Sequence, residues 1–202
     1  MVTQQTLIDK ARSLLRRSGI ARTRDLERVG VTRTQLRRLV DRDLIKRVGR
    51  GLYSLPETPP TEYHDLAEAA RRVPGGVVCL LSALRFHELT NQNPFEVWIA
   101  IERKAWRPKV QSPPMRFVYL SGPVLQEGVE THDISGVKVR VFSAAKTVAD
   151  CFKFRNKIGI DVAVEALADY RRRFPSRLEA VWRFAQVDRV SRVIQPYLES
   201  IR

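Results

Sequence analysis

The sequence predicts an α+β protein in which a small N-terminal domain, made of three helices and a β-hairpin, precedes a larger mixed α/β C-terminal domain. Three observations support this prediction: positive charge is concentrated in residues 1–56, a proline-rich run follows directly, and the remainder alternates between helical and strand patterns. We therefore expect domains at residues 1–56 and 61–202, joined by a linker at residues 57–60.

The positive charge is distributed unevenly along the chain. The 202 residues have a formal net charge of +14 at pH 7, and residues 1–56 alone contain 14 Lys and Arg against 5 Asp and Glu, a net charge of +9. Such a concentration favours a polyanionic partner such as nucleic acid. No apolar run approaches the roughly 18 residues needed to span a membrane, and the N-terminus lacks the pattern of an export signal. We therefore expect a cytoplasmic protein without membrane association.

Three helices are predicted in the N-terminal domain. Apolar residues recur at helical spacing over residues 6–18, and a second helix fits residues 23–29 with Thr23 as its N-cap. The third helix begins with a capping box, in which the Thr32 hydroxyl accepts from the backbone of Gln35 and the Gln35 side chain reaches back to Thr32. The tight, glycine-containing connection between the second and third helices is typical of a helix-turn-helix.

A β-hairpin is predicted after the third helix, because residues 44–48 and 52–55 have strand character around Gly49-Arg50-Gly51. Three helices followed by a basic hairpin predict a winged helix-turn-helix, a fold that places its third helix in the major groove of DNA. The predicted DNA-binding residues are Arg22, Thr32, Arg33, Thr34, Gln35, Arg37, Arg38, Lys46, Arg47 and Arg50. The alternative is that the same arginines form the solvated face of a protein-binding domain.

Helices and strands alternate in residues 61–202. Helices are predicted at residues 62–73 and 77–89, and strands at residues 97–101, 116–120, 129–134 and 137–141. Ser135-Gly136 predicts a two-residue turn between the last two strands. Ser143 is the expected cap of the next helix, and further helices are predicted at residues 161–172, 176–186 and 190–201.

No arrangement of residues indicates a catalytic site. The three histidines and two cysteines are too scattered for a zinc site, so we predict no metal, no cofactor and no catalytic residue. One alternative stays open: Glu102 and Lys104 follow a predicted strand with the spacing found in metal-dependent nucleases, and Glu88 and Glu96 are the nearby acids. That alternative protein would be a nuclease with a winged-helix targeting domain.

Other notable residues have ordinary structural explanations. Cys79 and Cys151 lie in apolar runs and are expected to be small buried residues. Lys146 and Asp150 are four residues apart on one predicted helix and indicate a surface ion pair or a structural tie to the sheet. Trp106 lies in a basic, proline-containing loop, which makes it a candidate interaction hot spot, although tryptophans most often lie in cores.

Four segments of the chain resemble AbiEi-type antitoxins. They are Gly19-Ile20-Ala21-Arg22-Thr23-Arg24-Asp25-Leu26, Gly49-Arg50-Gly51-Leu52-Tyr53, Leu80-Leu81-Ser82-Ala83-Leu84-Arg85-Phe86-His87-Glu88-Leu89-Thr90 and Phe142-Ser143-Ala144-Ala145-Lys146-Thr147-Val148-Ala149-Asp150-Cys151-Phe152. The resemblance covers most of residues 10–170. It implies an antitoxin of an abortive-infection, phage-defence system that represses its own operon by binding inverted repeats, with two protomers on the DNA. It also implies that the C-terminal domain, without catalysis, counters a nucleotidyltransferase-type toxin through the toxin's modification state or substrate access.

Overall fold

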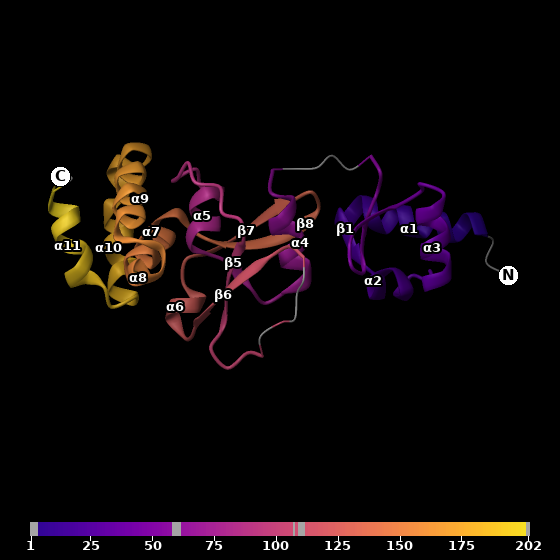
Figure 1. Cartoon of the computed structure of the whole chain (residues 1–202), viewed down its shortest axis with the longest axis horizontal. Helices are drawn as coiled ribbons and strands as arrows, with labels where there is room; N and C mark the ends of the chain where they lie inside the picture. Colours follow the sequence, from indigo (N-terminus) through magenta and orange to yellow (C-terminus); the bar gives the residue numbers. More distant parts are fainter. Residues whose placement is uncertain (1–3, 58–61, 107, 109–111, 201–202) are drawn as a thin grey trace. The chain divides into compact units, whose positions relative to one another are not determined.

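The computed structural model describes residues 4–57, 62–106, 108 and 112–200 (Figure 1). Contacts within the chain define two compact units. The first comprises residues 1–74 together with 110–113 and 132–139, and the second comprises residues 75–109, 114–131 and 140–202. Most of the predicted linker, residues 58–60, lies outside the described residues. The fold is α+β, with an N-terminal winged helix-turn-helix, as predicted.

The N-terminal unit contains the three predicted helices and the predicted wing. The helices are α1 (Gln4–Ser18), α2 (Thr23–Arg28) and α3 (Arg33–Asp41), and the strands are β1 (Ile20–Arg22), β2 (Lys46–Gly49) and β3 (Leu52–Ser54). The strands form an antiparallel sheet in the order β1-β3-β2, so β1, which was not predicted, pairs with the second strand of the wing. Helix α4 (His64–Arg72) belongs to the same unit.

The helix caps confirm one prediction and correct another. The Gln35 N–H donates to Thr32 Oγ1 at 3.3 Å and the Thr32 N–H donates to Gln35 Oε1 at 2.8 Å, which is the predicted capping box of α3. The prediction that Thr23 caps α2 is wrong, because Thr23 is already helical and Arg22 precedes the helix in an extended conformation. The Thr23 N–H instead donates to the Gly51 carbonyl at 2.9 Å. The Arg22 N–H donates to Asp25 Oδ2 at 3.2 Å, which supplies the cap from inside the helix.

The larger sheet has five strands in the order β6-β5-β4-β8-β7. Their bounds are β4 (Val77–Val78), β5 (Val97–Glu102), β6 (Met115–Leu120), β7 (Val129–Ile134) and β8 (Val137–Phe142). The predicted helix at residues 77–89 is wrong at its start, because Val77 and Val78 form the central strand, antiparallel to β5 and parallel to β8. A short buried run of β-branched residues fits a strand and a helix equally well, and here pairing on both sides decides for the strand.

Helices cover the sheet and continue the chain to residue 200. Helix α5 (Leu80–Phe86) follows β4, and α7 (Ala144–Lys153) follows β8 with Ser143 as its cap, as predicted. Helix α7 packs against α5, α9 (Ile160–Arg173) and α10 (Leu178–Val187), and α11 (Ser191–Ser200) follows. In Figure 1 the helices α7 to α11 gather beyond one end of the five-stranded sheet. Three short helices were not predicted: α6 (Pro123–Gln126), α8 (Arg155–Ile158) and a 3-10 helix (Pro175–Arg177).

Two local predictions are confirmed in the C-terminal part of the chain. Ser135 and Gly136 have φ values of +50° and +76°, the left-handed conformation that a type I′ two-residue hairpin turn requires at both central positions. Cys79 and Cys151 are both buried free thiols. Among the described residues, none of the helices has the length and apolar character needed to cross a bilayer.

Candidate nucleic-acid interface

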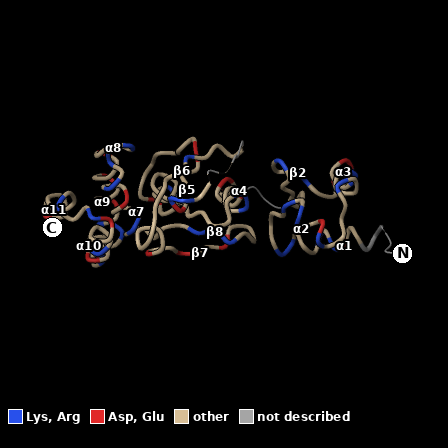
Figure 2. The backbone as a smooth tube through the Cα atoms, turned by 90° about the horizontal axis from the view of Figure 1, so that it is seen from below, with Lys and Arg blue, Asp and Glu red and all other residues tan. Residues whose placement is uncertain are grey.

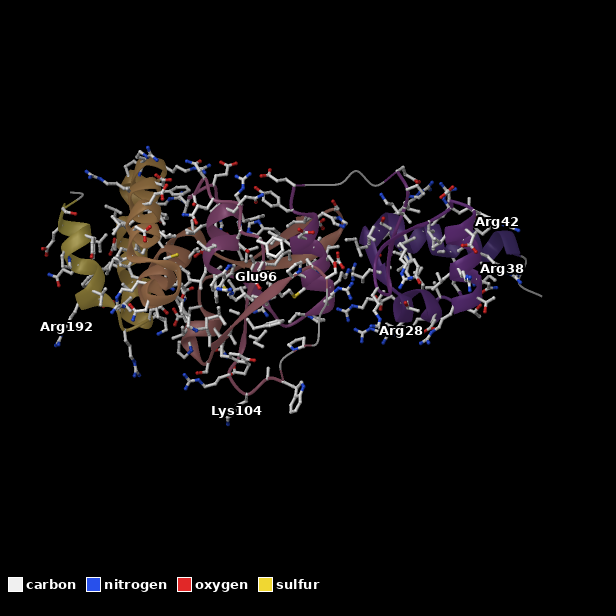
Figure 3. The ribbon with its side chains drawn as sticks, in the orientation of Figure 1. Arg28, Arg38, Arg42, Glu96, Lys104 and Arg192 are labelled. Carbon is white, nitrogen blue, oxygen red and sulfur yellow. The ribbon has the colours of Figure 1, made fainter. Side chains whose placement is uncertain are left out.

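Helix α3 has one buried face and one exposed, cationic face. Leu36 and Leu39 are buried in a core cluster that also contains Ala11, Leu15 and Leu26 of α1 and α2. Because an α-helix has 3.6 residues per turn, residues on the side opposite Leu36 and Leu39 face solvent. Its exposed residues are Arg33, Thr34, Arg37, Arg38 and one acid, Asp41. Figure 3 labels Arg38 on this helix and Arg42, the residue that follows the helix. The structure therefore brings four of the predicted DNA-binding residues together on one rigid element.

Two predicted residues of this helix are already engaged within the protein. Arg33 is 82% exposed, yet its Nε lies 2.9 Å from Glu27 Oε1 of α2. The half-buried Gln35 uses its Oε1 to accept from both the Thr32 N–H and the Thr32 hydroxyl. Contacts of Arg33 or Gln35 with a base would compete with these bonds, whereas Arg37 and Arg38 face solvent on the same helix.

The wing supplies three more exposed cations. Lys46 and Arg47 lie on β2, and Arg50 lies in the turn before β3. The Arg47 Nε donates to the Gly49 carbonyl at 3.3 Å, within its own strand. Figure 2 shows Lys and Arg positions in blue along β2 and α3 of this unit. Exposed cations on a wing are suited to contacts with phosphates, which orient a protein on DNA without reading its sequence.

Arg22 occupies a different environment from the other predicted residues. It is half-buried on β1, and burial is the main reason why its pKa is lowered. The positive charges of Arg24, Arg71 and Arg72 lower its pKa further, while Asp25 raises it. Arg22 therefore belongs to a cluster with two arginines of α4. Sequence reasoning missed Arg71 and Arg72, because the spacing of Glu68 and Arg72 predicts a bond within α4 and gives no sign of contacts outside that helix.

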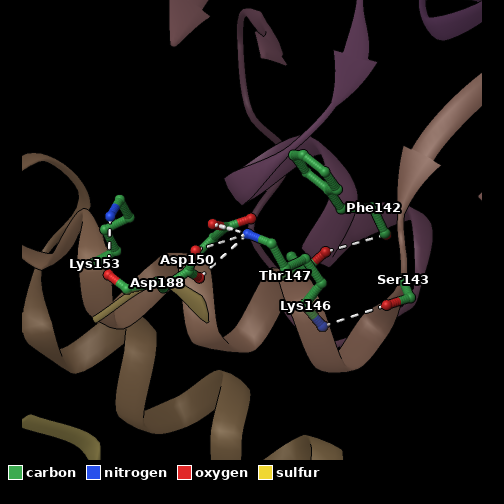
Figure 4. A network of polar contacts seen from close by, with 7 residues as sticks. All are labelled: Phe142, Ser143, Lys146, Thr147, Asp150, Lys153 and Asp188. Carbon is green, nitrogen blue, oxygen red and sulfur yellow. Dashed lines mark hydrogen bonds and ion pairs between the residues drawn. The ribbon is translucent and has the colours of Figure 1, made fainter. Parts of the chain in front are cut away.

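The C-terminal unit contains a buried charge network rather than a surface ion pair (Figure 4). Lys146 Nζ lies 2.5 Å from Asp150 Oδ1 and 3.1 Å and 3.2 Å from the two carboxylate oxygens of Asp188. All three residues are at most 1% exposed, so the expectation of a surface pair between Lys146 and Asp150 is wrong. The network ties α7 to Asp188 at the end of α10, whereas the other alternative was a tie to the sheet. Burial raises the pKa of Asp150 to about 8, against the attraction of Lys146. Asp188 was missed, because it is far away in sequence.

The acids considered for a nuclease site are each engaged separately. Glu88 forms an ion pair with Arg173 at 2.8 Å, and Glu96 forms one with Arg116 at 2.8 Å. Glu102 is exposed, and its Oε1 accepts from the neighbouring Arg103 N–H at 3.0 Å. Within the part of the chain that the structure describes, no three His, Cys, Asp or Glu side chains are grouped so that they could hold a metal ion.

Trp106 is highly exposed, as an interaction residue would be. The exposed fraction of this residue is 88%, and Arg103 and Lys104 in the same loop are exposed as well. Two further basic residues near Trp106 in the sequence, Arg107 and Lys109, lie outside the described residues.

A family model described as a transcriptional regulator, AbiEi antitoxin, matches residues 9–56. The matched segment includes α2, α3, all three strands of the small sheet and most of α1. A comparison of the chain with curated proteins finds no match.

Proposed function

We propose that this chain, whose residues 9–56 match the model of the AbiEi antitoxin transcriptional regulators, represses its own toxin–antitoxin operon and counters a nucleotidyltransferase-type toxin. In this proposal two protomers bind inverted repeats in the operator, in the cytoplasm. The observation that carries the DNA-binding part is the exposed cationic face of α3, formed by Arg33, Thr34, Arg37 and Arg38 over the buried Leu36 and Leu39.

The chemistry of this face suits the reading of bases in the major groove. An arginine can donate two hydrogen bonds to the O6 and N7 atoms of guanine, and a threonine can contact a base edge or a thymine methyl group. Arg37 and Arg38 are exposed on a helix that is held by its core and by its capping box, so their positions are preorganised. The exposed Lys46, Arg47 and Arg50 of the wing would neutralise phosphates beside the groove.

The antitoxic role is assigned to the C-terminal domain. What supports this part is the resemblance of residues 80–90 and 142–152 to AbiEi-type antitoxins. Residues 80–90 contain α5 and residues 142–152 contain most of α7, and these two helices pack against each other. The segments that carry the resemblance therefore include parts of the folded core. In the proposal this domain changes the toxin's modification state or its access to substrate rather than masking it tightly.

Replacing Arg37 or Arg38 by alanine tests the DNA-binding part directly. We expect each change to weaken binding to the promoter duplex upstream of the gene by about 1–3 kcal/mol, roughly 5- to 150-fold, because a bidentate contact with a base is lost. Binding to a random-sequence duplex of the same length should fall much less. Fluorescence anisotropy with both duplexes at one salt concentration measures the difference.

A suitable control is Arg192→Ala, which removes an exposed arginine from α11 (Figure 3). We expect this variant to bind both duplexes as the unmodified chain does. Equal losses on both duplexes for Arg37→Ala and Arg38→Ala would contradict base reading by α3. Unchanged binding in these variants would remove α3 from the interface.

A further inference from the structure

We propose that Glu68 and Arg72 of α4 are positioning residues that hold the wing in place for DNA, so that the DNA-binding unit extends beyond the residues matched by the family model. This inference rests on the proposed DNA binding. It concerns residues that lie in the same compact unit as the winged helix, after the segment expected to be a linker.

The Arg72 guanidinium joins α4 to the tip of the wing. Its Nη1 donates to the main-chain carbonyl of Arg50 at 3.1 Å. Its Nε and Nη2 donate to Glu68 Oε1 at 3.1 Å and 2.7 Å. One planar guanidinium therefore bonds a carboxylate on one side and a wing carbonyl on the other, an arrangement that the fixed donor geometry of arginine allows.

The ion pair between Glu68 and Arg72 is shielded from solvent, so breaking its geometry would leave a charge poorly solvated. The Glu68 side chain is 4% exposed and the Arg72 side chain is 16% exposed. Charges in such surroundings have lost much of their hydration, and they are tolerated only when they are paired and hydrogen-bonded. Glu68 thus fixes Arg72 in one orientation, and that orientation is the one that reaches the Arg50 carbonyl.

The backbone of the wing passes directly against this ion pair. A Cβ atom at Gly49 would lie 2.3 Å from Glu68 Oε1 and 2.7 Å from Arg72 Nη2, so only glycine fits without movement. The pairing of β2 with β3 also shifts register between Arg47 and Gly49. The hairpin is irregular at the point where α4 contacts it, and bonds from outside the hairpin compensate for that irregularity.

The turn of the wing is held from two sides. The Gly51 carbonyl accepts the Thr23 N–H at 2.9 Å from the start of α2, and the Arg50 carbonyl accepts from Arg72 of α4. The Arg50 residue itself is exposed. Its backbone is thus anchored to the protein while its side chain faces solvent, as preorganised contact with a phosphate requires.

A double-mutant cycle on the full chain tests this inference. We expect Arg72→Ala to weaken binding to the promoter duplex about as much as Arg50→Ala does, roughly fivefold at moderate salt for one lost phosphate contact. If α4 acts through the wing, Arg50→Ala should cost less than about twofold when Arg72 is already alanine. Arg37→Ala, which acts on α3, should keep its full effect in both backgrounds. Independent, multiplicative losses from Arg50→Ala and Arg72→Ala would overturn the inference.

Arg72→Lys separates positioning from direct contact with a phosphate. Lysine keeps the charge but cannot bond Glu68 and the Arg50 carbonyl in the same plane, so we expect this variant to bind as weakly as Arg72→Ala. Binding equal to that of the unmodified chain would overturn the inference. Arg72→Lys also carries the test alone if thermal unfolding shows that Arg72→Ala does not fold. If the unmodified chain binds neither duplex, the proposed function fails before the cycle begins.

Discussion

Replacing Lys146 by methionine should lower the free energy of unfolding by about 3–5 kcal/mol, the largest loss that we expect from a single substitution outside the core. The change would leave Asp150 and Asp188 buried at 1% exposure without their shared cation. Because the raised pKa keeps Asp150 protonated at pH 7, the lost hydration of the buried Asp188 carboxylate would then be uncompensated by any cation. Urea denaturation followed by circular dichroism measures the loss through the shift of the midpoint.

The matched control is Lys138→Met. Lys138 also pairs with an aspartate, Asp133, at 3.0 Å, but its side chain is 73% exposed. A surface pair of this kind contributes at most about 1 kcal/mol, so the control variant should unfold within about 1 kcal/mol of the unmodified chain. Similar losses in Lys146→Met and Lys138→Met would show that burial of the network has no special importance.

A second variant separates loss of the cation from loss of packing. The triple variant combines Lys146→Met with Asp150→Asn and Asp188→Asn, and none of its three side chains can carry a charge. Replacing a whole buried charged group by neutral residues is often close to neutral, so we expect this triple variant to recover part of the stability lost in Lys146→Met. A triple variant less stable than Lys146→Met would contradict an electrostatic origin of the loss.

The fold of the N-terminal unit could be predicted because its signals are local. The capping box of Thr32 and Gln35 and the Gly49-Arg50-Gly51 turn each depend on a few neighbouring residues, and the structure contains both elements. Strand β1 was missed because it has three residues and pairs with β3, far along the chain. Arg22 is the last residue of β1, and α2 begins at the next residue, Thr23, which had been predicted as the cap.

The candidate site shows the same limit. The exposed face of α3 follows from helical periodicity, so Arg37 and Arg38 could be selected from sequence. The contact of Arg72 with the Arg50 carbonyl could not, because nothing near Arg72 in the sequence indicates where the wing turn lies. Lys146 and Asp150 had a local signal in their spacing, but Asp188 is brought to them by the packing of α10 against α7. Sequence patterns thus predicted which residues face outward and missed the tertiary bonds that hold them.

The buried network should also make stability depend on pH, in a direction that Asp150 determines. Burial raises the pKa of Asp150 from 3.8 to about 8, with Asp188 raising it further and Lys146 opposing. The folded protein therefore binds a proton at Asp150 that the unfolded chain releases near pH 4. The stabilisation that comes from this bound proton is fully present below pH 4. It decreases as pH rises above 4 and is lost once pH has passed about 8.

Asp150→Asn isolates this effect, because asparagine has nearly the same shape and does not ionise. We expect Asp150→Asn to be more stable than the unmodified chain by about 1–2 kcal/mol at pH 5 and by several kcal/mol more at pH 9, since each pKa unit corresponds to about 1.4 kcal/mol. The other titratable groups near Asp150 should not mask this difference between pH 5 and pH 9. The pKa of Lys146 is raised, and burial raises the pKa values of Cys79 and Cys151, so these groups keep their protons over this range. Urea denaturation at pH 5, 7 and 9 gives the comparison.

Asp133→Asn is the control for this experiment, because the pKa shift of Asp133 has the opposite sign. Hydrogen bonds from Lys138 and from the Gly136 N–H lower the pKa of this exposed carboxylate. Asp133 is therefore ionised throughout pH 5 to 9, in the folded and the unfolded chain alike, and its replacement should shift stability equally at each pH. If Asp150→Asn shifts stability equally at each pH as well, then Asp150 is ionised in the folded protein at pH 5. In that case Lys146 outweighs burial, and the network is a fully charged triad whose stability does not depend on pH in this range.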